Sequence, residues 1–124
     1  EFYNCIAEGS KNNKLCYDDR KRDVRLETIP DFIKLKMDSI MNEIEKLDVF
    51  IPLDIEVKYS SDPNEKRTEI RSTFGRELTY GFDHSIHHLA IVKIAIQLNF
   101  PKIKIPDDLG VAPSTLQYRN QCAH

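Results

Sequence analysis

Residues 72–101 read STFGRELTYGFDHSIHHLAIVKIAIQLNFP and hold most of the information about the architecture. Ser72 or Thr73 suits the N-cap of a helix, and Pro101 stops that helix after about Asn99. Its apolar residues and two histidines recur at helical spacing on one broad face. They are Phe74, Leu78, Gly81, His84, His88, Ile91, Val92, Ala95 and Leu98. The pattern predicts a long amphipathic helix whose apolar face, histidines included, points into a core.

The segment before this helix predicts a small β-hairpin. After Pro52, apolar and charged residues alternate over positions 55–59, which is the two-residue period of a half-exposed strand. Residues 60–64 contain an Asp-Pro-Asn run that is typical of a turn. Residues 66–72 then predict the returning strand.

The rest of the chain predicts further helices joined by polar segments. Residues 1–8 have the spacing of a helix end, whereas residues 10–27 are polar and predict a long surface connection. Thr28 suits an N-cap and Pro30 the first turn of an amphipathic helix that ends near Asp48. After that, the prolines and short apolar residues of positions 101–124 predict an ordered tail rather than a full helix.

Composition limits the class of protein. The 124 residues fit one domain over 1–124, and a formal net charge of −2 without a clustered basic surface disfavours nucleic-acid binding. The longest apolar stretch is too short for a membrane span, and no secretory signal is visible. The three cysteines, Cys5, Cys16 and Cys122, contain no CxxC pair and imply neither a disulfide framework nor a cysteine zinc site. A reducing cytoplasm is therefore the expected compartment.

Three of the four histidines lie within five residues and are the one chemical signal in the sequence. Residues four apart on a helix lie on neighbouring turns of one face, so His84 and His88 can direct two ring nitrogens at one metal ion. A water-filled cleft or buried hydrogen-bond partners could satisfy the same pair. His87 lies about 100° from His88 around the helix and is expected beside the site rather than in it. Asp83 and Glu77 are interpreted as solvated carboxylates, although Glu77 could orient an imidazole.

Two histidines do not complete a metal site. A catalytic zinc generally has three protein ligands and an open position, so another donor is required. His124 is terminal and a poor candidate, and the absence of a second Glu-x-x-His pair disfavours a di-iron carboxylate centre. The missing ligand is expected upstream of Glu1.

Several motifs together carry a resemblance to a known family. These are Gly-Arg-Glu-Leu at 75–78, His-Ser-Ile-His-His at 84–88, Pro-Asp-Asp-Leu-Gly-Val-Ala-Pro-Ser-Thr-Leu at 106–116 and Tyr-Asp-Asp-Arg-Lys-Arg-Asp at 17–23. In this combination the chain resembles the DinB-like (DinB/YfiT-like) superfamily over nearly its whole length, without the N-terminal part. The resemblance implies a mainly α four-helix bundle, here N-terminally incomplete, with the hairpin ahead of the metal-bearing helix.

The same resemblance implies a divalent-metal-dependent enzyme. In the family an HxxxH pair, matched here by His84 and His88, joins a histidine from an earlier helix to hold zinc or nickel. Characterised members include transferases that use low-molecular-weight thiols, so a thiol-dependent S-transferase or a small-molecule hydrolase is expected, in some members as a homodimer. The alternative is a non-catalytic metal- or ligand-binding bundle or a dimerisation module.

Overall fold

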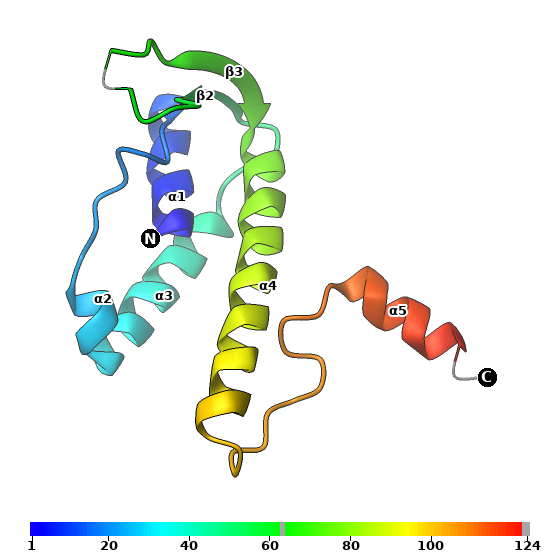
Figure 1. The fold of residues 1–124 in the computed structure, drawn as a ribbon. Helices are drawn as coiled ribbons and strands as arrows, with labels where there is room; N and C mark the ends of the chain where they lie inside the picture. Colours follow the sequence, from blue (N-terminus) through cyan, green and yellow to red (C-terminus); the bar gives the residue numbers. More distant parts are fainter. Residues whose placement is uncertain (63, 123–124) are drawn as a thin grey trace. The chain divides into compact units, whose positions relative to one another are not determined.

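Helices and a small sheet share the chain in the computed structural model, which describes residues 1–62 and 64–122 (Figure 1). In chain order the elements are α1 (Phe2–Asn12), β1 (Lys14–Leu15), α2 (Arg25–Thr28), α3 (Pro30–Ile44), β2 (Pro52–Val57), β3 (Thr68–Thr73), α4 (Phe74–Asn99) and α5 (Pro113–Cys122). The predicted mainly α four-helix bundle is wrong, because the described residues form an α+β arrangement in which the sheet supplies much of the core.

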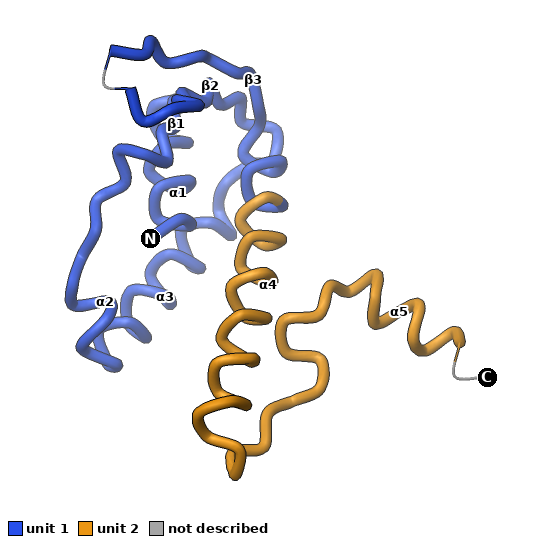
Figure 2. The backbone as a smooth tube through the Cα atoms, in the orientation of Figure 1, with its two compact units in different colours: residues 1–79 blue, residues 80–124 orange. Residues whose placement is uncertain are grey.

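Contacts along the chain divide it into two compact units, residues 1–79 and residues 80–124 (Figure 2). The first unit contains the sheet, α1, α2, α3 and the first turns of α4. The second contains the rest of α4, the segment that follows it and α5. The candidate histidines therefore belong to the second unit, and the prediction of one domain over 1–124 stays a prediction.

The sheet has the strand order β1, β2, β3. β2 and β3 pair in antiparallel fashion, with Ile55 opposite Ile70, so the predicted hairpin is confirmed. β1 pairs with β2 in parallel fashion, with Leu15 opposite Ile55. Along β2 the buried residues are Leu53 and Ile55, as expected for a strand with one face on a core.

The hydrophobic core lies in the first unit between the sheet and the helices. Its buried residues come from α1, β1, β2 and the start of α4, and they are Ile6, Leu15, Leu53, Ile55 and Phe74. Phe74 and Ile6 are fully buried. On α3 only Ile40 is buried, and Lys11 at the end of α1 pairs with Glu43 of α3. The core therefore joins elements that are distant in the sequence.

The segment 10–27 is more structured than the predicted surface connection. α1 continues to Asn12, and Asn13 adopts the left-handed conformation with φ 56° before the chain turns into β1. Asn tolerates this conformation better than most residues, because its short polar side chain can bond locally. Leu15 then enters the core. A single buried apolar residue in a polar stretch has no period, which is why the strand was not predicted.

The N-terminus of α4 is fixed by the preceding segments. Thr73 accepts a hydrogen bond at its Oγ1 from the backbone N–H of Arg76, at 3.2 Å, which confirms one of the two predicted N-caps. The backbone N–H of Phe74 donates to the carbonyl of Ile51 at 2.8 Å.

Helix α3 begins at Pro30 as predicted, but its N-cap is Ile29 rather than Thr28, and it ends at Ile44 rather than near Asp48.

In the second unit the chain after α4 returns along the helix. Lys93 donates from its Nζ to the carbonyl of Asp107 at 2.8 Å. Gly110 has φ 71°, and a β-carbon there would lie 2.3 Å from the backbone nitrogen of Ala90. The segment thus packs directly on the α4 backbone. The prediction that residues 101–124 contain no full helix is wrong, because Pro113–Cys122 form α5. His124 lies outside the described residues.

Among the residues described, no helix combines the length and the apolar character required to cross a bilayer.

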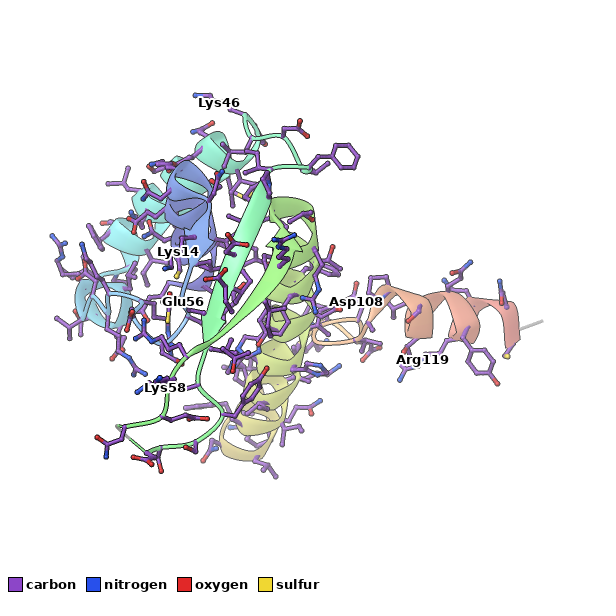
Figure 3. The ribbon with its side chains drawn as sticks, turned by 90° about the horizontal axis from the view of Figure 1, so that it is seen from above. Lys14, Lys46, Glu56, Lys58, Asp108 and Arg119 are labelled. Carbon is purple, nitrogen blue, oxygen red and sulfur yellow. The ribbon has the colours of Figure 1, made fainter. Side chains whose placement is uncertain are left out.

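An ion-pair network ties the hairpin to the segment after β1. Arg67 donates from both terminal nitrogens to the carboxylate of Asp19, at 2.6 Å each, and contacts Glu56 at 3.1 Å. Glu56 also pairs with Lys14 at 2.6 Å, and Figure 3 shows these two residues on neighbouring strands. Hydrogen bonding to Arg67 lowers the pKa of Asp19, and hydrogen bonding first to Lys14 and then to Arg67 lowers the pKa of Glu56.

This network predicts a specific pH dependence. Because both carboxyl groups have pKa values below their ordinary ones in the folded state, their stabilising contribution is present above the ordinary values. It is lost as pH falls below the ordinary values and through the lowered ones. We expect Arg67→Gln to lower the urea midpoint at pH 7 and to shrink the difference between the pH 7 and pH 3 midpoints. Arg71→Gln, on the exposed part of β3, is the matched control. An equal effect of the two substitutions would contradict the assignment.

Candidate metal site on helix α4

The side chains of His84 and His88 converge. Their Nε2 atoms are 3.0 Å apart, and their rings meet edge to face with centroids 4.5 Å apart and an interplanar angle of 76°. This follows from local structure, because both residues lie in the continuous helix α4 at a spacing of four. The predicted convergence of two imidazoles is present in the structure.

The surroundings of the pair differ from the expectation. His84 is half-buried, whereas His88 is exposed, as are Ile91 and Leu98 further along the same predicted face, at 63% and 78%. The prediction that both histidines point into a core is wrong for His88 in the described residues. Helical periodicity shows that a face is apolar, but it carries no information about what covers that face.

Other residues near the pair have distinct positions. Tyr80 lies one turn before His84, and the two rings are tilted by 30° with centroids 5.8 Å apart. His87 and Asp83 are exposed, as predicted from their positions around the helix. Tyr80 was not predicted as part of the site, although its spacing of four from His84 was the signal that could have identified it.

The geometry of the pair fits two ligands of one divalent ion. Two nitrogens bound at about 2.0–2.1 Å to a tetrahedral zinc lie about 3.3 Å apart, and the Nε2 atoms of His84 and His88 at 3.0 Å need only a small separation to reach that arrangement. Without a cation one imidazole must donate its proton to the other, because two unprotonated nitrogens at this distance repel each other. Within residues 1–62 and 64–122 no group of three or more possible ligands gathers. Of the described residues, two thus converge at this point, fewer than the three protein ligands of a typical catalytic zinc.

Glu77 does not behave as the solvated carboxylate that was predicted. It is only 5% exposed. Tyr17 donates from its hydroxyl to Oε2 at 2.6 Å, and Ser72 donates to Oε1 at 2.6 Å. Arg76 lies 3.6 Å from Oε1. This carboxylate joins the segment after β1, strand β3 and the first turn of α4, so its position is explained by the fold of the first unit.

The first unit also contains a cavity of about 520 Å³. It lies among α1, α2 and α3 and the segment before α2, with Tyr3, Leu26, Ile33 and Ile40 among its lining residues. The histidines do not line it. The candidate metal site is therefore formed by residues other than those that line this cavity.

Comparison with known proteins gives one informative similarity. No family model matches the chain, and no solved structure matches it. The chain is similar to a protein of Rhizopus delemar named FK506-binding protein 5, with 33% identity over 108 residues. The similar region covers 84% of the present chain but only 27% of that protein. The chain thus corresponds to about a quarter of its curated relative.

Proposed function

We propose that the chain binds a divalent metal ion through the Nε2 atoms of His84 and His88 and belongs to a metal-dependent enzyme of the DinB-like type. The observation that carries the proposal is the 3.0 Å approach of these two nitrogens on one helix face. The spacing of four brings the two rings together, and in the structure one ring nitrogen donates a hydrogen bond to the other. A shared cation gives both nitrogens a favourable partner.

Each histidine has a defined role in this proposal. His84 and His88 bind as neutral imidazoles through Nε2 and hold the ion at one point on α4. Tyr80 packs against the ring of His84 and restricts its orientation. When bound, zinc or nickel lowers the pKa of a water molecule or a thiol and so makes a nucleophile available near neutral pH. The resemblance implies a third histidine ligand from an earlier helix.

The reaction class rests on the resemblance rather than on the geometry. The motifs at 75–78, 84–88 and 106–116 support an enzyme that acts on a low-molecular-weight thiol, or else a small-molecule hydrolase. Exposure of His88 is compatible with either, because a small molecule can reach its ring directly. A non-catalytic metal-binding or dimerisation module is the competing proposal, since neither histidine is among the residues that line the first unit's cavity.

Metal binding by the pair gives a direct prediction. In equilibrium dialysis against zinc or nickel, we expect His88→Ala and His84→Ala each to weaken binding at least about tenfold, because each removes one nitrogen ligand. His87→Ala is the matched control, since it removes an exposed histidine of the same helix that points elsewhere. If His87→Ala weakened binding as much as His88→Ala, the ion would be held by non-specific surface histidines.

A second measurement separates an enzyme from a binding module. The metal-loaded protein is incubated with a low-molecular-weight thiol and an electrophilic acceptor, and the conjugate is quantified. Turnover that disappears in His88→Ala supports the thiol transferase. Stoichiometric metal with no turnover on thiol or hydrolysable substrates supports the non-catalytic module.

The similarity to FK506-binding protein 5 supports one further candidate, the binding of FK506. Its support is the 33% identity over 84% of the chain. Titration of the chain with FK506, followed by amide chemical shifts, tests it. Saturable shifts in the residues that line the first unit's cavity would favour this function, and unchanged spectra would remove it.

A further inference from the structure

The segment after α1 runs back along that helix and brings two cysteines together. Beyond the turn at Asn13, the backbone of Lys14 approaches so closely that a β-carbon on Gly9 would lie 2.9 Å from its carbonyl oxygen. Further along the same two segments, Cys5 donates from its Sγ to the carbonyl oxygen of Cys16 at 3.5 Å. The two cysteines are thus opposite each other across the interface between α1 and the segment 14–20.

Further contacts between α1 and the segment 14–20 stabilise the positions of the two cysteines. At the far end of the same interface, the rings of Phe2 and Tyr17 stack with centroids 5.0 Å apart. Arg20 donates to the carbonyl of Tyr17 at 2.8 Å and lies over the ring of Phe2, 5.1 Å from its centroid. Contacts on both sides therefore keep the backbone of the two cysteine-bearing segments in place.

The sulfur of Cys5 contacts the backbone of Cys16, and the two thiols also interact, since the Cys16 thiol contributes to the raised pKa of Cys5. The Cys16 thiol itself is hydrogen-bonded to the side chain of Asp19. Both residues are half-buried and neither is enclosed in the core, which leaves room for a small reagent to reach them. A disulfide between them would form by rotation of the two side chains toward each other.

We propose that Cys5 and Cys16 form a reversible disulfide by exchange with a low-molecular-weight disulfide. This proposal is independent of the histidine pair. The sequence implied no disulfide framework, because the odd number of cysteines and their spacing gave no sign that two of them meet in space.

The thiol–disulfide exchange takes place in two steps. The thiolate of Cys16 attacks one sulfur of the small disulfide, forms a mixed disulfide and releases one small thiol. The thiolate of Cys5 then attacks the sulfur of Cys16 and releases the second small thiol, so two protein thiols are oxidised and the small disulfide is reduced by two electrons. Burial, with the nearby Cys16 thiol, raises the pKa of Cys5, which makes Cys5 the slower attacker and suits it to the second step.

The disulfide would constrain the turn between α1 and β1. It closes a short loop that contains Asn13 and Leu15, and it fixes the start of the segment that carries Tyr17. Because the folded state already holds the two cysteines together, folding and disulfide formation should favour each other. We expect the equilibrium constant for closure to be at least about tenfold larger in the folded protein than in urea.

The test uses the full chain with Cys122→Ser, which removes the exposed third thiol. The folded protein is equilibrated with oxidised and reduced glutathione, quenched with acid and analysed by mass spectrometry. The expected product has lost two hydrogen atoms and gives a peptide that links Cys5 to Cys16. In Cys5→Ser the mixed disulfide on Cys16 should accumulate instead, because the attacking thiol of the second step is absent.

Two outcomes would overturn the proposal. In the first, the folded protein carries glutathione on both cysteines without closing the internal bond. In the second, closure is equally favourable in the folded protein and in urea, which would show that the fold does not bring the thiols together. Thermal unfolding of the oxidised and reduced forms gives an independent check, since the oxidised form should have the higher Tm.

Discussion

Phe74→Ala is expected to lower the free energy of unfolding of the first unit by about 3–5 kcal/mol, the loss that accompanies removal of a fully buried phenylalanine side chain. Phe74 is 0% exposed and packs in the cluster that joins Ile6 of α1, Leu15 of β1 and Leu53 of β2. Its removal leaves a cavity where several elements meet, so the surrounding residues cannot close it by moving a single side chain. Urea unfolding followed by circular dichroism measures the effect.

Phe50→Ala is the matched control for this prediction. Phe50 lies in the loop between α3 and β2 and is 80% exposed, so its removal should change the unfolding free energy by less than about 0.5 kcal/mol. Similar losses for the two variants would mean that the start of α4 does not form the centre of the core. A large loss for Phe74→Ala alone supports the arrangement of α4 against the sheet.

Gly110→Ala is expected to release the segment after α4 from the helix. Two effects add at this position. An alanine with φ near 71° is strained by about 1–3 kcal/mol, and its β-carbon would lie 2.3 Å from the backbone nitrogen of Ala90, which cannot move without distorting the helix. We expect faster amide hydrogen exchange over residues 100–112 and new proteolytic cleavage there.

Asp108→Ala provides the comparison for this second variant. Asp108 is exposed and its substitution adds no atom toward the helix, so exchange in the same segment should stay close to that of the unchanged protein (Figure 3). Unaltered exchange in Gly110→Ala would show that the close packing on Ala90 does not persist in solution.

Local features of the fold were predictable from the sequence. The cap at Thr73, the stop after Asn99 and the alternating pattern of β2 each depend on residues near one another, and the structure confirms them. Such signals identify elements because capping and periodicity act over a few residues. They do not identify the architecture, and the expected four-helix bundle was wrong.

The features that were missed depend on contacts between distant residues. β1 contains only two residues and exists because it pairs with β2, whose partner Ile55 is far away in the sequence. In the same way, burial of Glu77 depends on Tyr17 and Ser72, which the sequence gave no reason to place beside it. Neither the pairing of β1 nor the burial of Glu77 leaves a periodic pattern in the sequence, so neither was predictable from it.

The candidate site shows the same division. Convergence of His84 and His88 follows from a spacing of four on one helix and was predictable. The exposure of His88 depends on what packs over α4, which the helix itself does not encode. For Tyr80, the spacing of four from His84 is visible in the sequence, but the contact between the two rings is seen only in the structure.

The most direct test of the histidine pair is to follow the ring nitrogens of His84 and His88 by ¹⁵N NMR while zinc is added to the full chain. We predict that the Nε2 signals of both residues shift together to values of metal-bound nitrogen, while His87 remains unchanged. Metal-induced shifts confined to His87, or no shift in either His84 or His88 at saturating zinc, would contradict the proposed site.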